Sequence, residues 1–493
     1  MIIAVEVDAH HLAKGMLETL RFAEEGFVTR PADDPPNAWF EPVIKRAPTL
    51  DRLLFDEAGT YGASKVTLGN VVLVNVDGSL DALVTDYAFD GRRYRVRMGN
   101  PGQLYRDWQT VMAGTLSDVI VNNTSLELVI QDRLADLAKW QRPSYAGNNV
   151  LPDGVEGTKD DLKGQTKPRV YGRVWNVAPV FVNTAKLVYQ VSDTQCVIDA
   201  AYDRGIGLSR GPDYRDIPDL LAVPPGPGQY RCFLGHLRLG SMPVGEVTCD
   251  AISPQTRPAD LLMAVACDAG LVVADIDQVD VDQLNALAAP GVGVWADADV
   301  TTQTLMDALA GAIGAWYGFD RLGRLRMGRI DAPVGPPRAA WGRDAILAVN
   351  VRSAGIPAWK VNVRFAQNGT VQNDVGGAVP AARVAWLAQP SRIATAENAA
   401  RKIPWPHASE ITFDTPLIDE EAAMREAVRR LDLYGVRRST FDVDIPLSEL
   451  GAVDLGDVVQ IVTPRFGLER RLLRVIGINA GYDRGMAALV LWG

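Results

Sequence analysis

The sequence contains few of the residues on which metal binding and catalysis most often depend. Its 493 residues include only four histidines and four cysteines. The cysteines form no C-x-x-C pair, which is typical of reduced, buried thiols made in a cytoplasm; they are Cys196, Cys232, Cys249 and Cys267. Because the spacing of Cys232 and His236 is not that of a zinc ribbon, we expect no metal site.

Long uncharged segments are also missing. The longest one, residues 283–296, has 14 residues and contains Pro290 and Gly291. A membrane span needs about 20 apolar residues. Glu6 and Asp8 lie where a secretory signal would need a basic start and an uninterrupted apolar run. The sequence therefore predicts neither a membrane span nor a secretory signal.

Positive charge is in deficit. Lys and Arg total 50 against 60 Asp and Glu, which gives a net charge of -10, and there is no long basic run. A protein that binds nucleic-acid phosphates over its whole surface is expected to be basic. The composition therefore excludes that class of nucleic-acid-binding protein.

Catalytic motifs are absent as well. The sequence has no G-x-S-x-G elbow, no Walker loop and no H-E-x-x-H. In the series Gly205, Gly207, Gly211 the third glycine comes one position too late for a dinucleotide fingerprint. A carboxylate pair for glycoside hydrolysis stays open, because such residues can come from anywhere in the chain. We predict that the protein is not an enzyme, with no catalytic residue and no cofactor.

One acidic cluster needs an explanation, since four carboxylates lie within eight residues: Asp275, Asp277, Asp280 and Asp282. A calcium loop of the EF-hand kind requires Gly at its sixth position and Glu at its twelfth, where this sequence has Asp280 and Ala286. The match fails. We predict a solvated turn in which Asp280 or Asp282 caps the short helix that follows.

His10 and His11 lie close to Asp8, but consecutive residues of a strand point to opposite faces. No Cys or His follows at the spacing of metal ligands. We therefore predict a structural or solvent-facing role for both histidines.

What the sequence does have is glycine and proline, with 45 and 30 residues, and an ordinary globular balance of 47% apolar and 22% charged residues. The length predicts about three domains. Up to about residue 130 the apolar pattern has a period of two, which predicts strands over residues 66–76, 94–98, 111–121 and 126–130. Residues 17–27 fit a helix nearly as well as a strand, and we predict a strand. Residues 130–140 predict a helix.

Two tight turns of the first third have glycine after aspartate, which supplies the positive φ that a hairpin needs. They contain Asn75, Asp77 and Gly78, and Asp90 with Gly91. We predict a hairpin at each turn.

The rest of the chain changes character twice. Residues 143–167 are rich in Pro, Gly, Asn and Asp, which predicts a linker or long surface loop. The middle predicts strands over 169–191, helices over 257–269 and 302–315, and a hairpin over 316–330 that turns at Asp320 to Gly323. The last third predicts strands over 345–365, a helix over 419–434 and short strands over 440–492.

The predicted fold class is β-rich α+β and multidomain, with two β-barrel domains flanking a mixed α/β middle region. The predicted boundaries are 1–140 for the N-terminal barrel, 141–168 for the linker, 169–344 for the middle and 345–493 for the C-terminal barrel with helix 419–434.

The order of short motifs carries a resemblance that spans nearly the whole chain. The first barrel contains Asn75-x-Asp77-Gly78-x-Leu80-Asp81 and Phe89-Asp90-Gly91-Arg92. The middle contains Lys167-Pro168-Arg169-Val170-Tyr171-Gly172, Asp203-Arg204-Gly205 and Trp316-Tyr317-Gly318-Phe319-Asp320-Arg321-Leu322-Gly323. The end contains Leu455-Gly456-Asp457-Val458-Val459 and Leu491-Trp492-Gly493. In this order the motifs resemble those of tail-tip and baseplate hub proteins of long-tailed bacteriophages and prophages.

The resemblance implies a structural virion protein at the tail tip, made in the cytoplasm of a host bacterium. It implies a homotrimer whose two barrels per subunit form a ring of six, matching the sixfold tail tube above to a threefold spike or fibre below. The implied partners are other tail proteins: a distal tail ring, a spike or central fibre, and a tape-measure protein. DNA would pass the channel during ejection and viral entry without specific binding, along a wall that the net charge of -10 predicts to be acidic.

Within this resemblance, the turn residues Asn75, Asp77, Gly78, Asp90, Gly91, Asp320, Gly323, Gly456 and Asp457 mark the fold. We expect no lysozyme-like or peptidase domain after the last barrel. Two other functions stay open: a tail-associated cell-wall hydrolase that uses a carboxylate pair, and a sugar-binding tail module that uses some of the 11 tryptophans.

Overall fold

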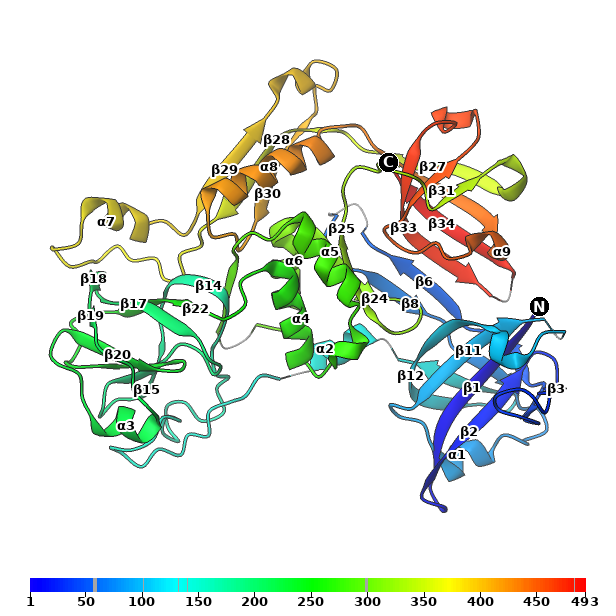
Figure 1. Cartoon of the computed structure of the whole chain (residues 1–493), viewed down its shortest axis with the longest axis horizontal. Helices are drawn as coiled ribbons and strands as arrows, with labels where there is room; N and C mark the ends of the chain where they lie inside the picture. The colour runs from blue at the N-terminus through cyan, green and yellow to red at the C-terminus, as the bar shows by residue number, and fades with distance from the viewer. Residues whose placement is uncertain (56–59, 101, 132, 140, 298–299, 483) are drawn as a thin grey trace.

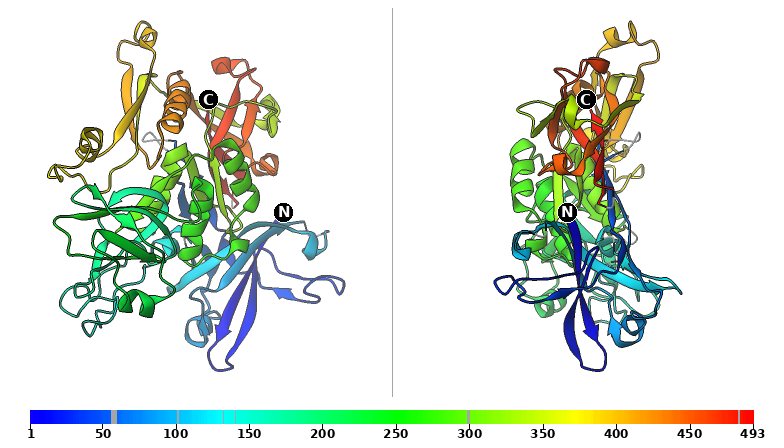
Figure 2. Two further views of the ribbon diagram at one scale, coloured as in Figure 1. Left: turned by 60° about the vertical axis from the view of Figure 1, so that its left-hand side comes forward. Right: turned by 90° about the vertical axis from the view of Figure 1, so that its right-hand side faces the viewer.

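The computed structural model describes residues 1–493 except 56–59, 101, 132, 140, 298–299 and 483. The sheets formed by the two ends of the chain lie next to each other on one side of the molecule, a β-sandwich lies on the other side, and helices lie between them (Figure 1). Seen from the side, the molecule is narrower (Figure 2). The described part of the chain contains no helix that is long and apolar enough to cross a membrane.

The N-terminal sheet has eight strands. In order they are β10 (Tyr87–Ala88), β1 (Ile2–His11), β11 (Arg93–Gly99), β12 (Gln109–Val121), β13 (Ser125–Ile130), β9 (Val71–Val74) and β5 (Ile44–Arg46), with β2 (Met16–Ala23) also paired to β1. Strand β1 is buried on both faces, because Val5 and its alternate neighbours face the main core while Ile2 and Ala4 pack against Phe40 and Trp108.

The C-terminal sheet also has eight strands, two of which come from the N-terminal third. They are β26 (Ala339–Trp341), β32 (Val458–Ile461), β33 (Leu472–Gly481), β34 (Met486–Trp492), β31 (Ser439–Pro446) and β27 (Ala348–Ala354), with β6 (Thr49–Leu53) on β33 and β8 (Lys65–Leu68) on β6. The predicted domain boundaries stay predictions. Strand β6 belongs to the predicted N-terminal domain but pairs with β33 of the predicted C-terminal domain.

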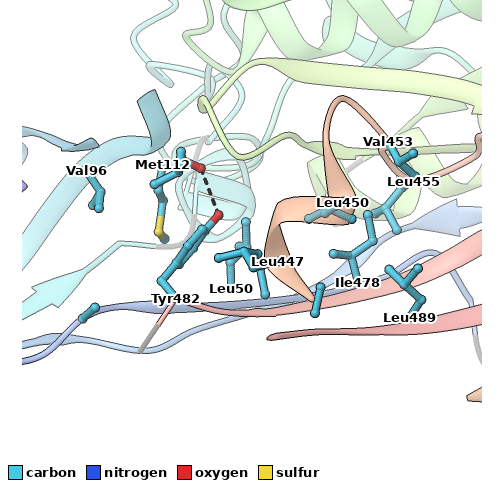
Figure 3. Close-up of a cluster of buried hydrophobic side chains, with 14 of the residues drawn as sticks. Leu50, Val96, Met112, Leu447, Leu450, Val453, Leu455, Ile478, Tyr482 and Leu489 are labelled. Atoms are coloured by element: carbon cyan, nitrogen blue, oxygen red, sulfur yellow. Dashed lines mark hydrogen bonds between the residues drawn. The ribbon is translucent and has the colours of Figure 1, made fainter. Parts of the chain in front are cut away.

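One hydrophobic core joins the two end sheets. It contains Val5, Val96 and Met112 from the first sheet and Ile478 and Leu489 from the second, and Figure 3 shows side chains of both sheets meeting in it. Burying apolar area stabilises a fold by about 25 cal/mol per Å². The two ends of the chain therefore stabilise each other.

The prediction of two closed barrels is not met by the strand pairing. Among the described residues, β2 pairs with β1 and β5 pairs with β9. In the described part of the chain, the segment that leads into β5 meets β2 only at Glu41, whose N–H donates 3.1 Å to the carbonyl of Arg21 and whose carbonyl accepts 2.7 Å from the N–H of Ala23. In the second sheet, β27 pairs with β31 only. As far as the described residues go, the first sheet is therefore closed only at residues 21–23 of β2 and stays unpaired along residues 16–20, whereas the second sheet is open at β27. The β-rich, multisheet class is the part of the predicted fold that the structure shows.

The sandwich consists of two five-stranded sheets. The first contains β18 (Ile206–Gly207), β17 (Val197–Asp203), β22 (Val247–Ile252), β14 (Arg169–Val177) and β23 (Gly293–Ala296). The second contains β15 (Val180–Asn183), β16 (Val188–Gln190), β21 (His236–Leu239), β20 (Gln229–Phe233) and β19 (Ser209–Arg210). The loop predicted as a linker packs on this sandwich, because Tyr145 and Leu162 are buried beside Val182 and Leu220.

Helices fill the centre of the molecule. They are α2 (Arg133–Lys139), α4 (Pro258–Asp268), α5 (Gln278–Leu287), α6 (Thr302–Ile313) and α8 (Glu420–Tyr434). They share a second core with the sheet of β25 (Leu325–Arg329), β24 (Ala315–Phe319) and β7 (Gly62–Ala63) and the sheet of β29 (Arg392–Glu397), β28 (Ala358–Phe365) and β30 (Ser409–Asp414). The helix predicted over 130–140 is α2, and its Trp140 lies outside the described residues.

Helix α8 shows how local sequence sets an element. The carboxylate of Asp419 accepts a 2.7 Å hydrogen bond from the backbone N–H of Ala422, which caps the helix. Glu420 and Glu421 follow in the first turn, where the helix dipole favours negative charge, and Gly435 ends the helix. The helix predicted over 419–434 is thus confirmed.

The remaining elements are short. They are β3 (Phe27–Val28), β4 (Trp39–Phe40), α1 (Ala82–Asp86), α3 (Ile217–Ala222), α7 (Ala381–Leu387) and α9 (Leu447–Leu450), with 3-10 turns at Tyr105–Asp107, Val273–Asp275, Arg343–Ala345, Ala399–Lys402 and Arg465–Gly467.

Two predictions for the first third are wrong. Residues 66–76 do not form one strand: Gly69 and Asn70 break the pattern, so that β8 and β9 belong to different sheets. The turns at Asn75 and at Asp90 do not form hairpins. The first leads into α1, and the second lies between β10 and β11, which both pair along the same strand, β1.

Candidate assembly surfaces

The turn that contains Asn75, Asp77 and Gly78 is fixed by side-chain hydrogen bonds. Asn75 is buried, accepts a 2.9 Å bond from the backbone N–H of Leu80 and donates a 2.8 Å bond to Asp81. Hydrogen bonds from Ser79 lower the pKa of the Asp77 carboxyl. Gly78 has a φ of 72°, a conformation that costs glycine little. This turn directs the chain from β9 into α1.

The turn at Asp90 and Gly91 is an outward bend between β10 and β11. The backbone N–H of Gly91 donates a 2.9 Å hydrogen bond to the carbonyl of Leu116 in β12, and Asp90 is exposed. The bend is therefore attached to the neighbouring strand β12.

The turn between β24 and β25 connects the middle of the chain to the N-terminal sheet. The Asp320 carboxylate accepts hydrogen bonds of 2.8 Å from the Leu322 N–H and 2.9 Å from the Arg324 N–H. The backbone N–H of Ala113 in β12 donates a 2.8 Å bond to the carbonyl of Arg321. Gly323, the last residue of the turn, has a φ of 75°. The hairpin predicted over 316–330 is confirmed, and its tip contacts β12.

Gly456 and Asp457 directly precede β32 and lie beside β33. The backbone N–H of Gly456 donates a 2.8 Å hydrogen bond to the carbonyl of Val475, and the N–H of Val475 donates a 2.9 Å bond to the carbonyl of Asp457. Burial raises the pKa of the Asp457 carboxyl. The fold-marking turns thus lie in four separate places, and the structure does not bring them together in one site.

The cysteines and His236 belong to the sandwich. Cys196, Cys232 and Cys249 are buried in its core. Burial raises the pKa of the Cys196 and Cys232 thiols to about 12 and lowers that of His236 to about 4. Among the described residues, no three His, Cys, Asp or Glu side chains are grouped in a way that could hold a metal ion.

The acidic cluster pairs with arginines instead of facing only solvent. Asp275 lies 3.0 Å from Arg133, and Asp280 lies 2.5 Å from Arg326. The prediction that Asp280 or Asp282 caps the following helix is wrong. Asp277 is the N-cap of α5, and it accepts from the N–H groups of the second and third helical residues. The helix begins earlier than predicted, because Gln278 and Val279 belong to its first turn.

His10 and His11 lie near the end of the β1–β2 hairpin. The ring of His11 packs against Tyr87, with 4.7 Å between the ring centroids. The hydroxyl of Tyr87 donates a 2.7 Å hydrogen bond to Glu18 on β2. This end of the hairpin is thus held by polar and aromatic contacts.

Apolar side chains are exposed at the same hairpin. Leu12, Met16 and Leu17 are each more than half exposed. Along Met16–Leu20, no backbone hydrogen bond to the outer edge of β2 is found among the described residues. An unpaired strand edge with apolar side chains is a template for pairing with another strand.

Strand β27 forms a second open edge. In the described part of the C-terminal sheet it pairs with β31 on one side only. Its flanks Leu347 and Ile356 are exposed, and so is Val351 within it. Sequence reasoning missed both edges. The sequence of residues 17–27 contained one signal of the first edge. Its apolar residues do not alternate as in a strand with one buried face, so the pattern fitted a helix nearly as well as a strand.

No protein-family model matches the chain, and no curated protein matches its sequence. Among solved structures, the chain is similar to the 43 kDa tail protein of prophage MuSo2 from Shewanella oneidensis, with a TM-score of 0.43 and 11% identity over 100% of this chain and 98% of that chain. It is similar to the tail protein from Neisseria meningitidis MC58, with a TM-score of 0.42 and 10% identity over 99% and 96%. It is also similar to a chain in the virion of a native gene transfer agent particle, with a TM-score of 0.45 and 14% identity over 67% and 84%.

These three structures are tail or virion proteins, the class that the order of the sequence motifs resembles.

Proposed function

We propose that the chain is a structural, non-enzymatic subunit of a bacteriophage tail tip or baseplate hub. Three copies form a homotrimer whose six sheets make one ring. The ring joins the sixfold tail tube to a threefold spike or fibre and forms part of the channel for DNA ejection during viral entry. The order of the sequence motifs supports the location in the tail.

The observation that carries the proposal is the pair of eight-stranded sheets on one shared core, each with an open edge. The part of β2 formed by residues 16–20 is the open edge of the first sheet, and β27 is that of the second. A contact between two different edges of neighbouring copies is head-to-tail, and such contacts form closed rings when the rotation between copies fits. Three copies supply six sheets, which is the number that matches a sixfold tube.

The chemistry of the edges favours a protein partner. The exposed side chains of Met16 and Leu17 lie beside backbone groups of β2 that lack a strand partner among the described residues. On β27, the exposed side chain of Val351 likewise lies on a strand with one unpaired edge in the described part of the sheet. Strand pairing would satisfy the backbone groups and bury the apolar side chains together. It would also continue each open sheet toward the barrel that the sequence predicts. In this proposal residues 1–140 and 345–493 are the two ring-forming units.

The proposed partners are a distal tail ring above the hub, a spike or central fibre below it, and a tape-measure protein. The proposed location is the virion, after synthesis in the cytoplasm of the host bacterium. DNA passes the channel without specific binding, and the net charge of -10 supports a channel wall that repels phosphate.

Native mass spectrometry of the full chain tests the oligomeric state. We expect a main species with three times the 53.4 kDa mass of the chain, and electron micrographs of a ring with threefold symmetry. A monomer at micromolar concentration, or a ring with another number of copies, would contradict the proposal.

A zymogram on peptidoglycan tests the non-enzymatic part. We expect no clearing by the purified chain. Clearing that a single Glu→Gln or Asp→Asn substitution abolishes would replace the structural role with that of a cell-wall hydrolase.

A further inference from the structure

A long connection crosses from one part of the molecule to another. Strands β28 and β29 are antiparallel neighbours, yet residues 367–391, which we call the strap, leave their sheet before returning to it. The strap carries α7, which lies beside β17 and β18 of the sandwich (Figure 1). Connections longer than about 12–15 residues are uncommon in compact domains and usually have a function.

The first part of the strap lies on strand β14 of the sandwich. The side-chain amide of Asn176 donates 2.8 Å to Asn368 and 2.6 Å to the carbonyl of Thr370. The backbone N–H of Gly369 donates 3.0 Å to the carbonyl of Trp175. A Cβ at Gly369 would lie 2.7 Å from Val177 Cγ1 and 3.1 Å from its Cα, so only glycine permits this close approach.

The second part of the strap lies on the β17–β18 turn. Asp374 forms an ion pair with Arg204, and the N–H of Gly376 donates 2.8 Å to the carbonyl of Arg204. The guanidinium of Arg383 lies over two aromatic rings, at 4.5 Å from the centroid of Tyr202 and 4.6 Å from that of Trp386. Polar and cation-π contacts therefore hold the strap at both ends.

Polar atoms are also left without partners in this contact. Residues of β22 alternate between the two faces of its sheet, and Thr248 and Asp250 are on the face opposite the sandwich core. Thr248 Oγ1, Asn176 Oδ1 and Gln372 Oε1 are buried and have no hydrogen-bond partner among the described residues, and neither do Nε and Nη2 of Arg383. The contact is therefore polar and leaves buried groups unsatisfied, which makes it weaker than a fully hydrogen-bonded one.

The strap contributes little to the hydrophobic cores. All of its residues are described, and none belongs to any of the core clusters. Leu387 is its one fully buried apolar side chain. A polar contact between parts of a chain separates more easily than a hydrophobic core does.

We propose that the strap is a clasp that docks on the sandwich and undocks from it as a unit, while the sandwich and the β29-β28-β30 sheet stay folded. Docking joins the outer face of β14, β22 and β17 to that sheet. Undocking removes this connection and exposes the side chain of Arg383.

Limited proteolysis with trypsin reports on undocking. Trypsin must take the Arg383 side chain into its specificity pocket, and in the docked strap Nε and Nη2 of Arg383 are buried. We compare the rate of cleavage after Arg383, followed by mass spectrometry, in the full chain and in two Gly→Leu variants. Gly369→Leu places a side chain against β14, whereas Gly377→Leu has no atom within 4 Å of its Cβ and is the matched control.

We expect Gly369→Leu to be cleaved after Arg383 at least about tenfold faster than the wild type, because overpacking a close contact shifts a two-state equilibrium by that order. Gly377→Leu should match the wild type. Hydrogen exchange of the wild type should be faster in the strap than in β22, and the exchange of β22 should be the same in all three proteins. Equal cleavage of the three proteins, or strap exchange as slow as that of β22, would overturn the proposal. So would faster β22 exchange in Gly369→Leu, since the strap would then be an integral part of the sandwich.

Discussion

The hydroxyl of Tyr482 donates a 3.1 Å hydrogen bond to the backbone carbonyl of Val111, 371 positions earlier in the chain (Figure 3). Val111 is the extra residue of a β-bulge, because neighbouring residues of β11 pair with Met112 and Thr110 and pass it by. A bulge leaves the extra residue unpaired in the ladder. The last third of the chain thus satisfies a backbone group that the first third leaves open.

The variant Tyr482→Phe should lower the free energy of unfolding by about 1–3 kcal/mol, because it leaves the buried carbonyl of Val111 without its donor. Urea unfolding measures the change. Tyr87→Phe is the control: it removes a hydroxyl bonded to the half-buried Glu18, and its cost should be at most about 1 kcal/mol. Equal effects of the two variants would mean that the Tyr482 bond adds nothing to the joining of the two sheets.

The buried carboxylate of Glu426 makes stability depend on pH. Burial by itself raises the pKa of Glu426, but hydrogen bonds and charge from Arg429 and Arg430 outweigh it and hold the pKa below the usual value of 4.5. A carboxyl with a lowered folded-state pKa contributes stability above its unfolded pKa, and this contribution is lost as the pH falls through the folded pKa. We therefore expect the melting temperature to fall as the pH is lowered below 4.5.

The variant Glu426→Gln should be less stable at pH 7 and should lose less stability between pH 5 and pH 3, which thermal melts at several pH values measure. Glu421→Gln on the same helix is the control, because Glu421 is exposed and paired only at the surface with Arg425. If Glu426→Gln keeps the full acid dependence of the wild type, another carboxyl controls it.

The open edges should control assembly without controlling folding. Val351→Lys and Leu17→Lys place a charge on β27 and on β2, which opposes strand pairing between copies. We expect each to convert the trimer into monomer in native mass spectrometry, with the melting temperature of the monomer unchanged. Ile403→Lys is the control, because Ile403 is 83% exposed and belongs to neither edge strand. A trimer that persists in both edge variants would place the interface elsewhere.

The thiols should differ in reactivity. At pH 8 the burial that raises the pKa of Cys196 and Cys232 to about 12 leaves almost no thiolate, and Cys249 is shifted in the same direction by burial. Cys267 is only partly buried. A disulfide reagent should therefore react first with Cys267 in the native protein and with all four thiols in denaturant. Fast native reaction of Cys249 would show that the sandwich core opens.

The cap of α5 can be tested with two aspartates. Asp277→Ala should lower the free energy of unfolding by about 0.5–2 kcal/mol, because the Asp277 carboxylate accepts from the first N–H groups of the helix. Asp282→Ala should change it by less than about 0.5 kcal/mol, since its carboxylate accepts only from Gln278 on the surface. Urea unfolding of both variants distinguishes them, and the reverse order would restore the cap position predicted from the sequence.

Local signals in the sequence predicted the elements whose causes are local. Helix α8 follows from its N-cap Asp419, its acidic first turn and Gly435, and the β24–β25 hairpin follows from the turn at Asp320 and Gly323. These features act within a few residues of chain, so a single sequence contains them in full. The scarcity of His and Cys and the missing catalytic motifs are likewise properties of the sequence alone.

The sequence by itself determined a β-rich chain with its main helices, its tight turns and an order of motifs that resembles phage tail proteins. Only the tertiary structure decided that β6 pairs with β33, that Tyr482 meets Val111 and that the strap lies on the sandwich. Pairings of this kind join residues far apart in the chain, and the free energy comes from burying surfaces that no local pattern identifies. For the same reason β2 and β27 became visible as open edges only when the neighbours of every other strand were known.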